Sequence, residues 1–212
     1  MGSRIMHLAI ANELLTEYPD LDRNRFLFGT LLPDAATEGN SHARIDVCDG
    51  GMRTYDLTGF RRQHAGRLNT DALYLGFYLH LIQDMVFRQF VYGACRWDPA
   101  PPGNIERLHR DYAILNGHLI GKYRLSPDVA IQPGVEAEPL LRDCSYDPDA
   151  LVRELKADFA QKESGALFFF RRDMADEYIA QSLPYCRREI AAVQTGSGFM
   201  DELSMAWARK GL

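Results

Sequence analysis

Residues 71–88 read DALYLGFYLHLIQDMVFR, and this stretch decides the fold. Its apolar residues recur with helical spacing and cover more than one face, which is typical of a helix buried in the middle of a domain. Asp71 can cap the start of the helix. We expect the helix to continue to about Arg96, because residues 98–103 (DPAPPG) form a clear break.

The rest of the chain is also predicted to be helical, apart from a long loop over residues 34–57 that is rich in glycine and small polar residues. Only residues 166–170 are ambiguous, and no alternating pattern predicts a strand. The fold class is therefore predicted to be all-α, a single-domain multi-helix bundle over residues 1–212. Further helices are expected between Ser3 and the Tyr18-Pro19 stop and at residues 23–32, 58–68, 105–123, 148–161, 171–193 and 200–209.

Composition limits the classes of function. The 212 residues are 46% hydrophobic, enough for a sizeable core, and carry a formal net charge of -5. This charge argues against binding to duplex nucleic acid or to an anionic membrane surface, because both need a basic face.

The cysteines and the apolar stretches bear on the compartment. Four cysteines lie without CxxC spacing, so we expect reduced thiols rather than a zinc cage or disulfides. The first 15 residues hold no sustained apolar run, which argues against a secretory signal. The longest apolar stretch is too short for a transmembrane segment. We expect a cytoplasmic protein; its oligomeric state is not predicted.

His80 and Asp84 are the sharpest feature of the central helix, because they interrupt an apolar segment. Four residues apart on a helix, the imidazole and the carboxylate point to the same side and can bind one divalent cation. Burying an ionised carboxylate is costly unless it is paired or bound to metal. For such a pair taken alone, a hydrogen bond within the core is the commoner explanation.

Three other polar residues have an ordinary explanation when taken singly. His7 lies among apolar residues on the first helix, where a satisfied core histidine is the usual case. Asp34 follows Pro33 at a helix end, as a turn or cap residue would. His42 lies in the long loop, where a surface position is expected. Their order along the chain carries more information than any one of them.

In that order the chain resembles the zinc-dependent phospholipase C family, which shares its fold with single-strand-specific zinc nucleases. A looser block, DYAILN at 111–116, is similar to the short intracellular bacterial members. The resemblance covers about the first 90 residues, in the segments IMHLAIA (5–11), FLFGTLLPD (26–34), SH (41–42) and YLGFYLHLIQD (74–84).

The resemblance implies a set of metal ligands. Asp34, His42, His80 and Asp84 match the positions that hold one zinc in this family. His7 matches the histidine that holds another, with Asp84 bridging the two ions. The residues expected to be catalytic are Asp84 and Asp34.

The chain also departs from the family pattern. It lacks the N-terminal Trp whose amino group and carbonyl serve as ligands in the secreted members, and Phe90 lies where a third site would begin, so a third metal is doubtful. Asp111 is a candidate ligand that would complete a reduced site. His118 shares its helix face but is expected at the surface, and His64 and His109 are expected to be exposed.

The function expected from these residues is metal-dependent hydrolysis of phosphate esters, a phosphodiesterase reaction of the phospholipase C kind. One or two zinc ions would activate a water, and oxygen donors would also tolerate Mn or Fe. The substrate could be a small phosphate ester or resemble a phospholipid. A lipid would need an exposed apolar rim, for which the candidates are Tyr55, Phe60 and Trp97.

Two points stay open at this stage. The general acid is unassigned, with Glu38 and Asp46 only weak candidates. The alternatives to the hydrolase are a non-catalytic helical module with a residual structural metal site and a different helical metal-dependent phosphohydrolase. The latter is disfavoured because the chain has no His-Asp dipeptide.

Overall fold

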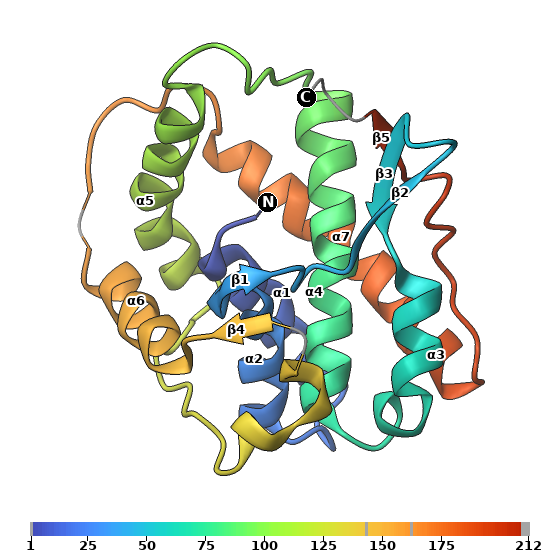
Figure 1. Cartoon of the computed structure of the whole chain (residues 1–212). Coiled ribbons are helices and arrows are strands. Elements are labelled where there is room, and N and C mark those ends of the chain that lie inside the picture. Colours follow the sequence, from blue (N-terminus) through green and yellow to red (C-terminus); the bar gives the residue numbers. More distant parts are fainter. Residues whose placement is uncertain (1, 143, 162, 209–212) are drawn as a thin grey trace.

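The central helix is present in the computed structural model, which describes residues 2–142, 144–161 and 163–208 (Figure 1). Helix α4 (Ala72–Arg88) continues into a π-helical turn, Gln89–Ala94, so the predicted long helix is confirmed. All residues of α4 except the last are buried, as expected from an apolar surface on more than one face. Of the residues that the structure describes, 60% are helical, most of them in seven α-helices, but small sheets are also present, so the fold is not purely α-helical.

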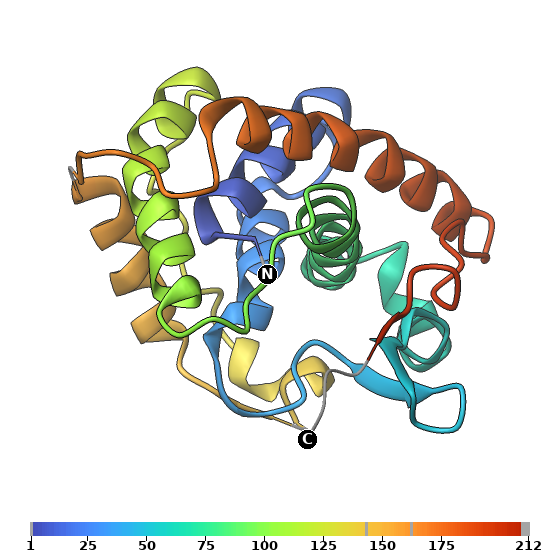
Figure 2. The ribbon, with the colours of Figure 1, turned by 90° about the horizontal axis from the view of Figure 1, so that it is seen from above.

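The other helices surround α4, which is seen end-on in the middle of Figure 2. Four of them pack against it: α1 (Arg4–Glu17), α2 (Arg23–Leu31), α3 (Leu57–Leu68) and α7 (Arg172–Gln194). Two more, α5 (Asn104–Lys122) and α6 (Pro148–Ala160), pack against each other and against α1. These bounds agree with the predicted helices to within a few residues. The side chains of Ser3, Asp22 and Asp71 accept a hydrogen bond at three of the helix starts.

Two glycines allow α2 and α4 to approach closely. A Cβ atom on Gly76 would lie 2.3 Å from the carbonyl oxygen of Phe26, and one on Gly29 would lie 2.1 Å from that of Leu73. Both contacts are with backbone atoms of the facing helix, which side-chain rotation cannot relieve. These glycines therefore bring the backbone of α2 against α4 about one turn before His80.

The segment predicted as a long loop contains strands, so the all-α prediction is wrong in this region. Strand β1 (Ala36–Gly39) pairs antiparallel with β4 (Cys144–Tyr146). Strands β2 (Arg44–Val47) and β3 (Met52–Tyr55) form a hairpin, with Val47 opposite Met52. Asp49 and Gly50 turn the hairpin with φ values of 54° and 83°. Asp-Gly favours such a turn, because Gly and Asp tolerate positive φ.

The C-terminal segment differs from the predicted helix at residues 200–209. Its described part is made of turns that end in strand β5 (Trp207–Ala208), which pairs with β3; residue 209 lies outside the described residues. Glu189 of α7 accepts hydrogen bonds from the backbone N–H groups of Phe199 and Met200. These bonds draw the chain back against α7, so it cannot continue as a free amphipathic helix.

Two further features of the described chain bear on the predictions. All four cysteines are free, as expected. Among the residues that the structure places, no helix has both the length and the apolar character needed to cross a bilayer.

Candidate metal centre

Five polar side chains from separate parts of the chain meet beside α4. His80 and Asp84 come from α4 itself and His7 from α1. Asp34 lies in the 3-10 turn Leu32–Ala35 that follows α2, and His42 lies in the turn between β1 and β2. We call these five residues the His/Asp cluster.

His80 is held by the neighbouring helix. It is fully buried, and its Nδ1 donates to the carbonyl oxygen of Thr30 at 2.8 Å. A carbonyl oxygen only accepts, so Nδ1 carries the proton. Burial, and next the charge of His7, lower the pKa of His80 to about 3. The imidazole is therefore neutral near pH 7, and its Nε2 faces the cluster with a lone pair.

His42 and Asp34 close one side of the cluster. The Nε2 atoms of His42 and His80 lie only 3.2 Å apart, and His42 Nε2 lies 3.6 Å from Asp34 Oδ1. Ser41 fixes the ring through a contact of 2.9 Å between its Oγ and His42 Nδ1. Two imidazole nitrogens at this distance need either a hydrogen on one of them, donated to the other, or a metal ion between them.

The two oxygens of Asp84 face different histidines. Oδ2 lies 3.5 Å from His42 Nε2 and 3.8 Å from His80 Nε2, and it accepts a hydrogen bond from the Tyr55 hydroxyl at 3.4 Å. Oδ1 lies 3.5 Å from His7 Nε2 and accepts from the backbone N–H of Gly2 at 3.2 Å. The carboxylate thus lies between two halves of the cluster, one formed by Asp34, His42 and His80 and the other by His7.

His7 completes the second half. Its ring stacks on that of His80 with centroids 4.1 Å apart, and its Nδ1 lies 2.7 Å from Oε1 of the buried Gln83. Its Nε2 is buried and has no hydrogen-bond partner among the described residues. With the Nδ1 proton donated to Gln83, Nε2 faces Asp84, where either a second proton on the ring or a metal ion would satisfy both groups.

The charges of the cluster favour ionised carboxylates. Burial raises the pKa of Asp84, but the neighbouring imidazole of His7, and next that of His80, outweigh it and hold the pKa well below its usual range. Burial likewise raises the pKa of Asp34, and the neighbouring imidazoles of His80 and then His42 lower it further than burial raises it. For His7, burial lowers the pKa, and the nearby Asp84 carboxylate raises it overall.

The ligand atoms are close enough to share cations. His7, His80 and Asp84 offer atoms that all lie within 4.8 Å of one another, and so do Asp34, His42 and His80. Imidazole nitrogens and carboxylate oxygens are the donors typical of zinc outside thiolate sites, and they also suit Mn and Fe. Five of the six predicted ligands therefore lie together, in positions that fit one or two divalent ions.

The sixth predicted ligand, Asp111, does not join the cluster. It is buried on α5, and its carboxylate accepts three backbone hydrogen bonds of 2.7 to 2.8 Å, from Phe168, Phe169 and Phe170. Both of its oxygens are used in fixing the segment before α7. We therefore leave Asp111 out of the candidate centre.

Several secondary predictions need correction. Tyr55, Phe60 and Trp97 are buried and cannot form an exposed rim for a lipid. His64, predicted to be exposed, is buried and packs against Phe60.

The remaining secondary candidates lie at or near the surface. His109 is exposed as expected, and His118 is partly exposed and lies 3.3 Å from Asp176. Of the weak candidates for the general acid, Asp46 is exposed and paired with Arg53. Glu38 lines a cavity of about 240 Å³ beside Asp34 and His42.

Sequence reasoning missed the residues that hold the ligands in place. The carbonyl oxygen of Thr30 and the amide of Gln83 orient His80 and His7, and Tyr55 contacts Asp84. For Gln83 a signal existed, because an amide between two candidate ligands on an apolar helix needs a partner of its own. A carbonyl such as that of Thr30 leaves no trace in the sequence.

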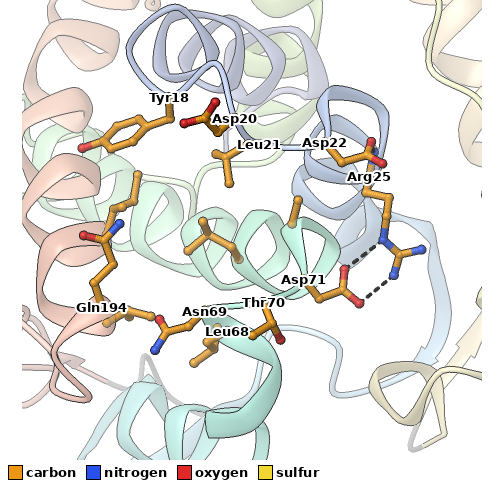
Figure 3. A pocket seen from close by; sticks show the side chains of 14 residues that line it. Tyr18, Asp20, Leu21, Asp22, Arg25, Leu68, Asn69, Thr70, Asp71 and Gln194 are labelled. Carbon is orange, nitrogen blue, oxygen red and sulfur yellow. Dashed lines mark hydrogen bonds and ion pairs between the residues drawn. The ribbon is translucent and has the colours of Figure 1, made fainter.

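Cavities show from which side the cluster is reached. One of about 510 Å³ is lined by Gly2 and Asp34 and lies between α1, α5 and α6. Another, of about 480 Å³, lies elsewhere, and its lining includes no residue of the His/Asp cluster (Figure 3). In that one, Asp71 is already paired with Arg25 at 2.7 Å. Access to the cluster is therefore past Asp34, whose side chain is 14% exposed while that of Asp84 is fully buried.

Comparison with known proteins adds no relative. No protein-family model, curated protein or solved structure matches this chain.

Proposed function

We propose that this protein is a metal-dependent hydrolase of phosphate esters, with phosphodiesterase chemistry and a fold of the phospholipase C and zinc nuclease type. The ions, one or two and preferably zinc, would be held by His7, Asp34, His42, His80 and Asp84. The observation that carries the proposal is the meeting of these five side chains beside α4, in the order that resembles the family.

The chemistry of the donors supports a metal rather than a simple polar core. Two ionised carboxylates and three imidazoles in one buried place would be costly without compensating charge. His7 Nε2 is left without a hydrogen-bond partner in the described part of the chain, and a cation would satisfy it. Bound zinc supplies Lewis-acid activation of water and neutralises charge on phosphoryl oxygens.

Each residue of the chain has a separate task in this proposal. Asp84 would bridge two ions and set their separation, since each of its oxygens faces a different half of the cluster. Asp34 lies where the cluster meets solvent-filled space, so it is the ligand closest to an incoming substrate. Thr30, Ser41 and Gln83 hold the histidine rings in orientation.

The second candidate is a helical module with a structural metal site. It is favoured by His42 together with the three ligands around it, because four protein ligands fill a tetrahedral zinc site and leave no open position. It predicts one ion per chain and no hydrolysis. The hydrolase predicts about two ions and open positions on the His7 side.

The test is elemental analysis of the purified chain, followed by hydrolysis of bis(4-nitrophenyl) phosphate with and without a chelator. We expect about two zinc ions per chain, turnover that the chelator abolishes and recovery when zinc is returned. One tightly held ion, no turnover and a large fall in melting temperature with chelator would favour the structural module. No bound metal at all would refute both.

A matched pair of variants tests the residues. Asp84→Asn keeps the shape of the side chain but removes its charge, so we expect it to reduce bound metal to at most one ion and to abolish turnover. His118→Gln, outside the cluster and partly exposed, should keep both. Equal metal content in the two variants would refute the assignment of Asp84.

A further inference from the structure

The cavity of about 510 Å³ beside the cluster has a polar lining. Its lining residues come mainly from α1, α5 and α6, which pack against one another. Two of its residues contact the cluster directly, because Asp34 belongs to it and the Gly2 N–H donates to Asp84. A phosphate ester bound at the cluster would therefore extend one of its alcohol groups into this space.

Asn116 on α5 is an unusual member of the lining. Its side chain is buried, with 3% of the residue exposed, and its Oδ1 has no hydrogen-bond partner among the residues described. A buried amide oxygen is normally paired, because an unpaired one is destabilising. A ligand in the cavity can supply the missing partner.

The charged groups of the lining are paired with one another or belong to the cluster. The guanidinium of Arg4 is paired with Asp158 at 2.9 Å and with Glu154 at 2.7 Å, and Asp34 belongs to the cluster. Partial desolvation lowers the pKa of His109, so its imidazole is neutral near pH 7. One guanidinium facing two carboxylates leaves a small excess of negative charge, so charge alone does not exclude a cationic group. A choline group is disfavoured because it has no N–H or O–H to donate to Asn116 Oδ1.

Apolar contacts in the cavity are few. Within the described lining, the methyl group of Ala113 is the only aliphatic side chain, and Tyr112 contributes an aromatic ring. Acyl chains need continuous apolar walls, which this lining does not offer. A hydroxyl group suits it better, because a hydroxyl both donates and accepts and so pairs with either end of an amide such as Asn116 or Gln161.

We propose that this cavity, the polyol pocket, binds the neutral, hydroxyl-bearing alcohol of a phosphate ester, such as a glycerol or sugar group, with Asn116 as its specificity-determining residue. The proposal rests on the proposed function, since it uses the cluster as the site of the phosphate. It deepens that function by favouring water-soluble polyol esters over lipids and over esters of choline.

The test compares three diesters that share 4-nitrophenol as leaving group and differ in the second alcohol: glycerol, ethanol or choline. For the zinc-loaded protein we expect kcat/KM for the glyceryl diester to exceed that for the ethyl diester about tenfold. Asn116→Leu should remove this preference, so that the glyceryl and ethyl diesters are hydrolysed with similar kcat/KM. Asn104→Leu, on the same helix but outside the pocket, should keep it.

Asn116 is buried, so the melting temperature of each variant is measured first. Gln161→Leu, at an exposed position of the same lining, is a second variant expected to weaken the glyceryl preference. Hydrolysis of all three diesters at similar rates, or a preference for the choline diester, would refute the polyol pocket and leave the hydrolase standing.

A binding measurement keeps the two proposals separable if no diester is hydrolysed. Calorimetry of the zinc-loaded protein with glycerol 1-phosphate and with inorganic phosphate needs no turnover. We expect glycerol 1-phosphate to bind about tenfold more tightly, and Asn116→Leu to bind both equally. Equal binding by the unaltered protein would refute the pocket, whereas tighter glycerol 1-phosphate binding without hydrolysis would refute only the catalytic function.

Discussion

Replacing Gly76 by alanine should disturb both the packing of α4 and the metal centre. The new Cβ would lie 2.3 Å from the carbonyl oxygen of Phe26 and 2.8 Å from the backbone nitrogen of Thr30. Because both atoms belong to the backbone of α2, the helices must separate. Overpacking of this kind costs about 1–3 kcal/mol, and contact with backbone puts it at the upper end. Alanine is about 1 kcal/mol more favourable than glycine inside a helix, which offsets part of this cost.

We therefore expect Gly76→Ala to lower the free energy of unfolding by about 2 kcal/mol, which corresponds to about 4–8 °C in melting temperature for a chain of this size. The matched control is Gly117→Ala, inside α5, where an added Cβ meets nothing within 4 Å. It should stabilise the protein by about 0.5–1 kcal/mol through helix propensity alone. Urea unfolding of both variants measures the difference.

The same substitution should weaken metal binding. Separation of α2 from α4 lengthens the 2.8 Å hydrogen bond from His80 to the Thr30 carbonyl oxygen, which fixes the tautomer of His80. Loss of such a supporting bond typically costs about 10–100-fold in metal affinity. Competition with a chelator measures it. A Gly76→Ala protein as stable as Gly117→Ala would refute the packing argument, and unchanged affinity in a destabilised variant would refute the role of Thr30.

Two further predictions concern residues outside the cluster. Asp111→Ala should lower the free energy of unfolding by about 2–3 kcal/mol, because three backbone N–H groups lose their acceptor. Urea unfolding measures this loss, and the metal content should be unchanged. Loss of one ion would instead restore Asp111 as a ligand. Burial raises the pKa of Asp71, but Arg25 outweighs it and the folded pKa is lowered. The stability that the ionised Asp71 contributes is thus fully present above its pKa in the unfolded chain, about 3.9, and is lost as the pH falls through its lower pKa in the folded protein. Arg25→Gln should lower the free energy of unfolding by about 1 kcal/mol at pH 7 and progressively less below pH 4. Urea unfolding at several pH values measures this, and a loss that does not depend on pH would contradict the ion pair.

The helices could be predicted because their signals are local. Apolar spacing in residues 71–88 and caps such as Asp71 determine α4 without reference to the rest of the chain. The hairpin of β2 and β3 was missed although Asp49-Gly50 favours a turn of this kind, because the surrounding glycines and polar residues were interpreted as a loop.

Two other failures, Asp111 and the C-terminal segment, share a physical cause, which is that the deciding partner lies elsewhere in the chain. Asp111 looks like a possible ligand until the backbone of residues 168–170 is seen to occupy it. The C-terminal segment has helical spacing, but Glu189 binds its backbone amides and β3 pairs with its end. In each case backbone groups, which the sequence does not distinguish, determine where the side chain or the chain goes.

The two halves of the cluster differ in how far the protein alone can satisfy them. Around His42 a single proton on Nε2 would suffice, since Nε2 of His80 and both carboxylates lie within 3.2 to 3.6 Å of it. Around His7 one proton is not enough, because Nδ1 faces Oε1 of Gln83 and Nε2 faces Oδ1 of Asp84. A bare Nε2 and a carboxylate oxygen 3.5 Å apart in a buried place would repel each other, so this half needs a positive charge, either a second proton on His7, which its raised pKa favours, or a metal ion in its place. The half with fewer protein ligands is thus the one with the greater electrostatic need for a cation, and it is also the half with coordination positions left for water and substrate.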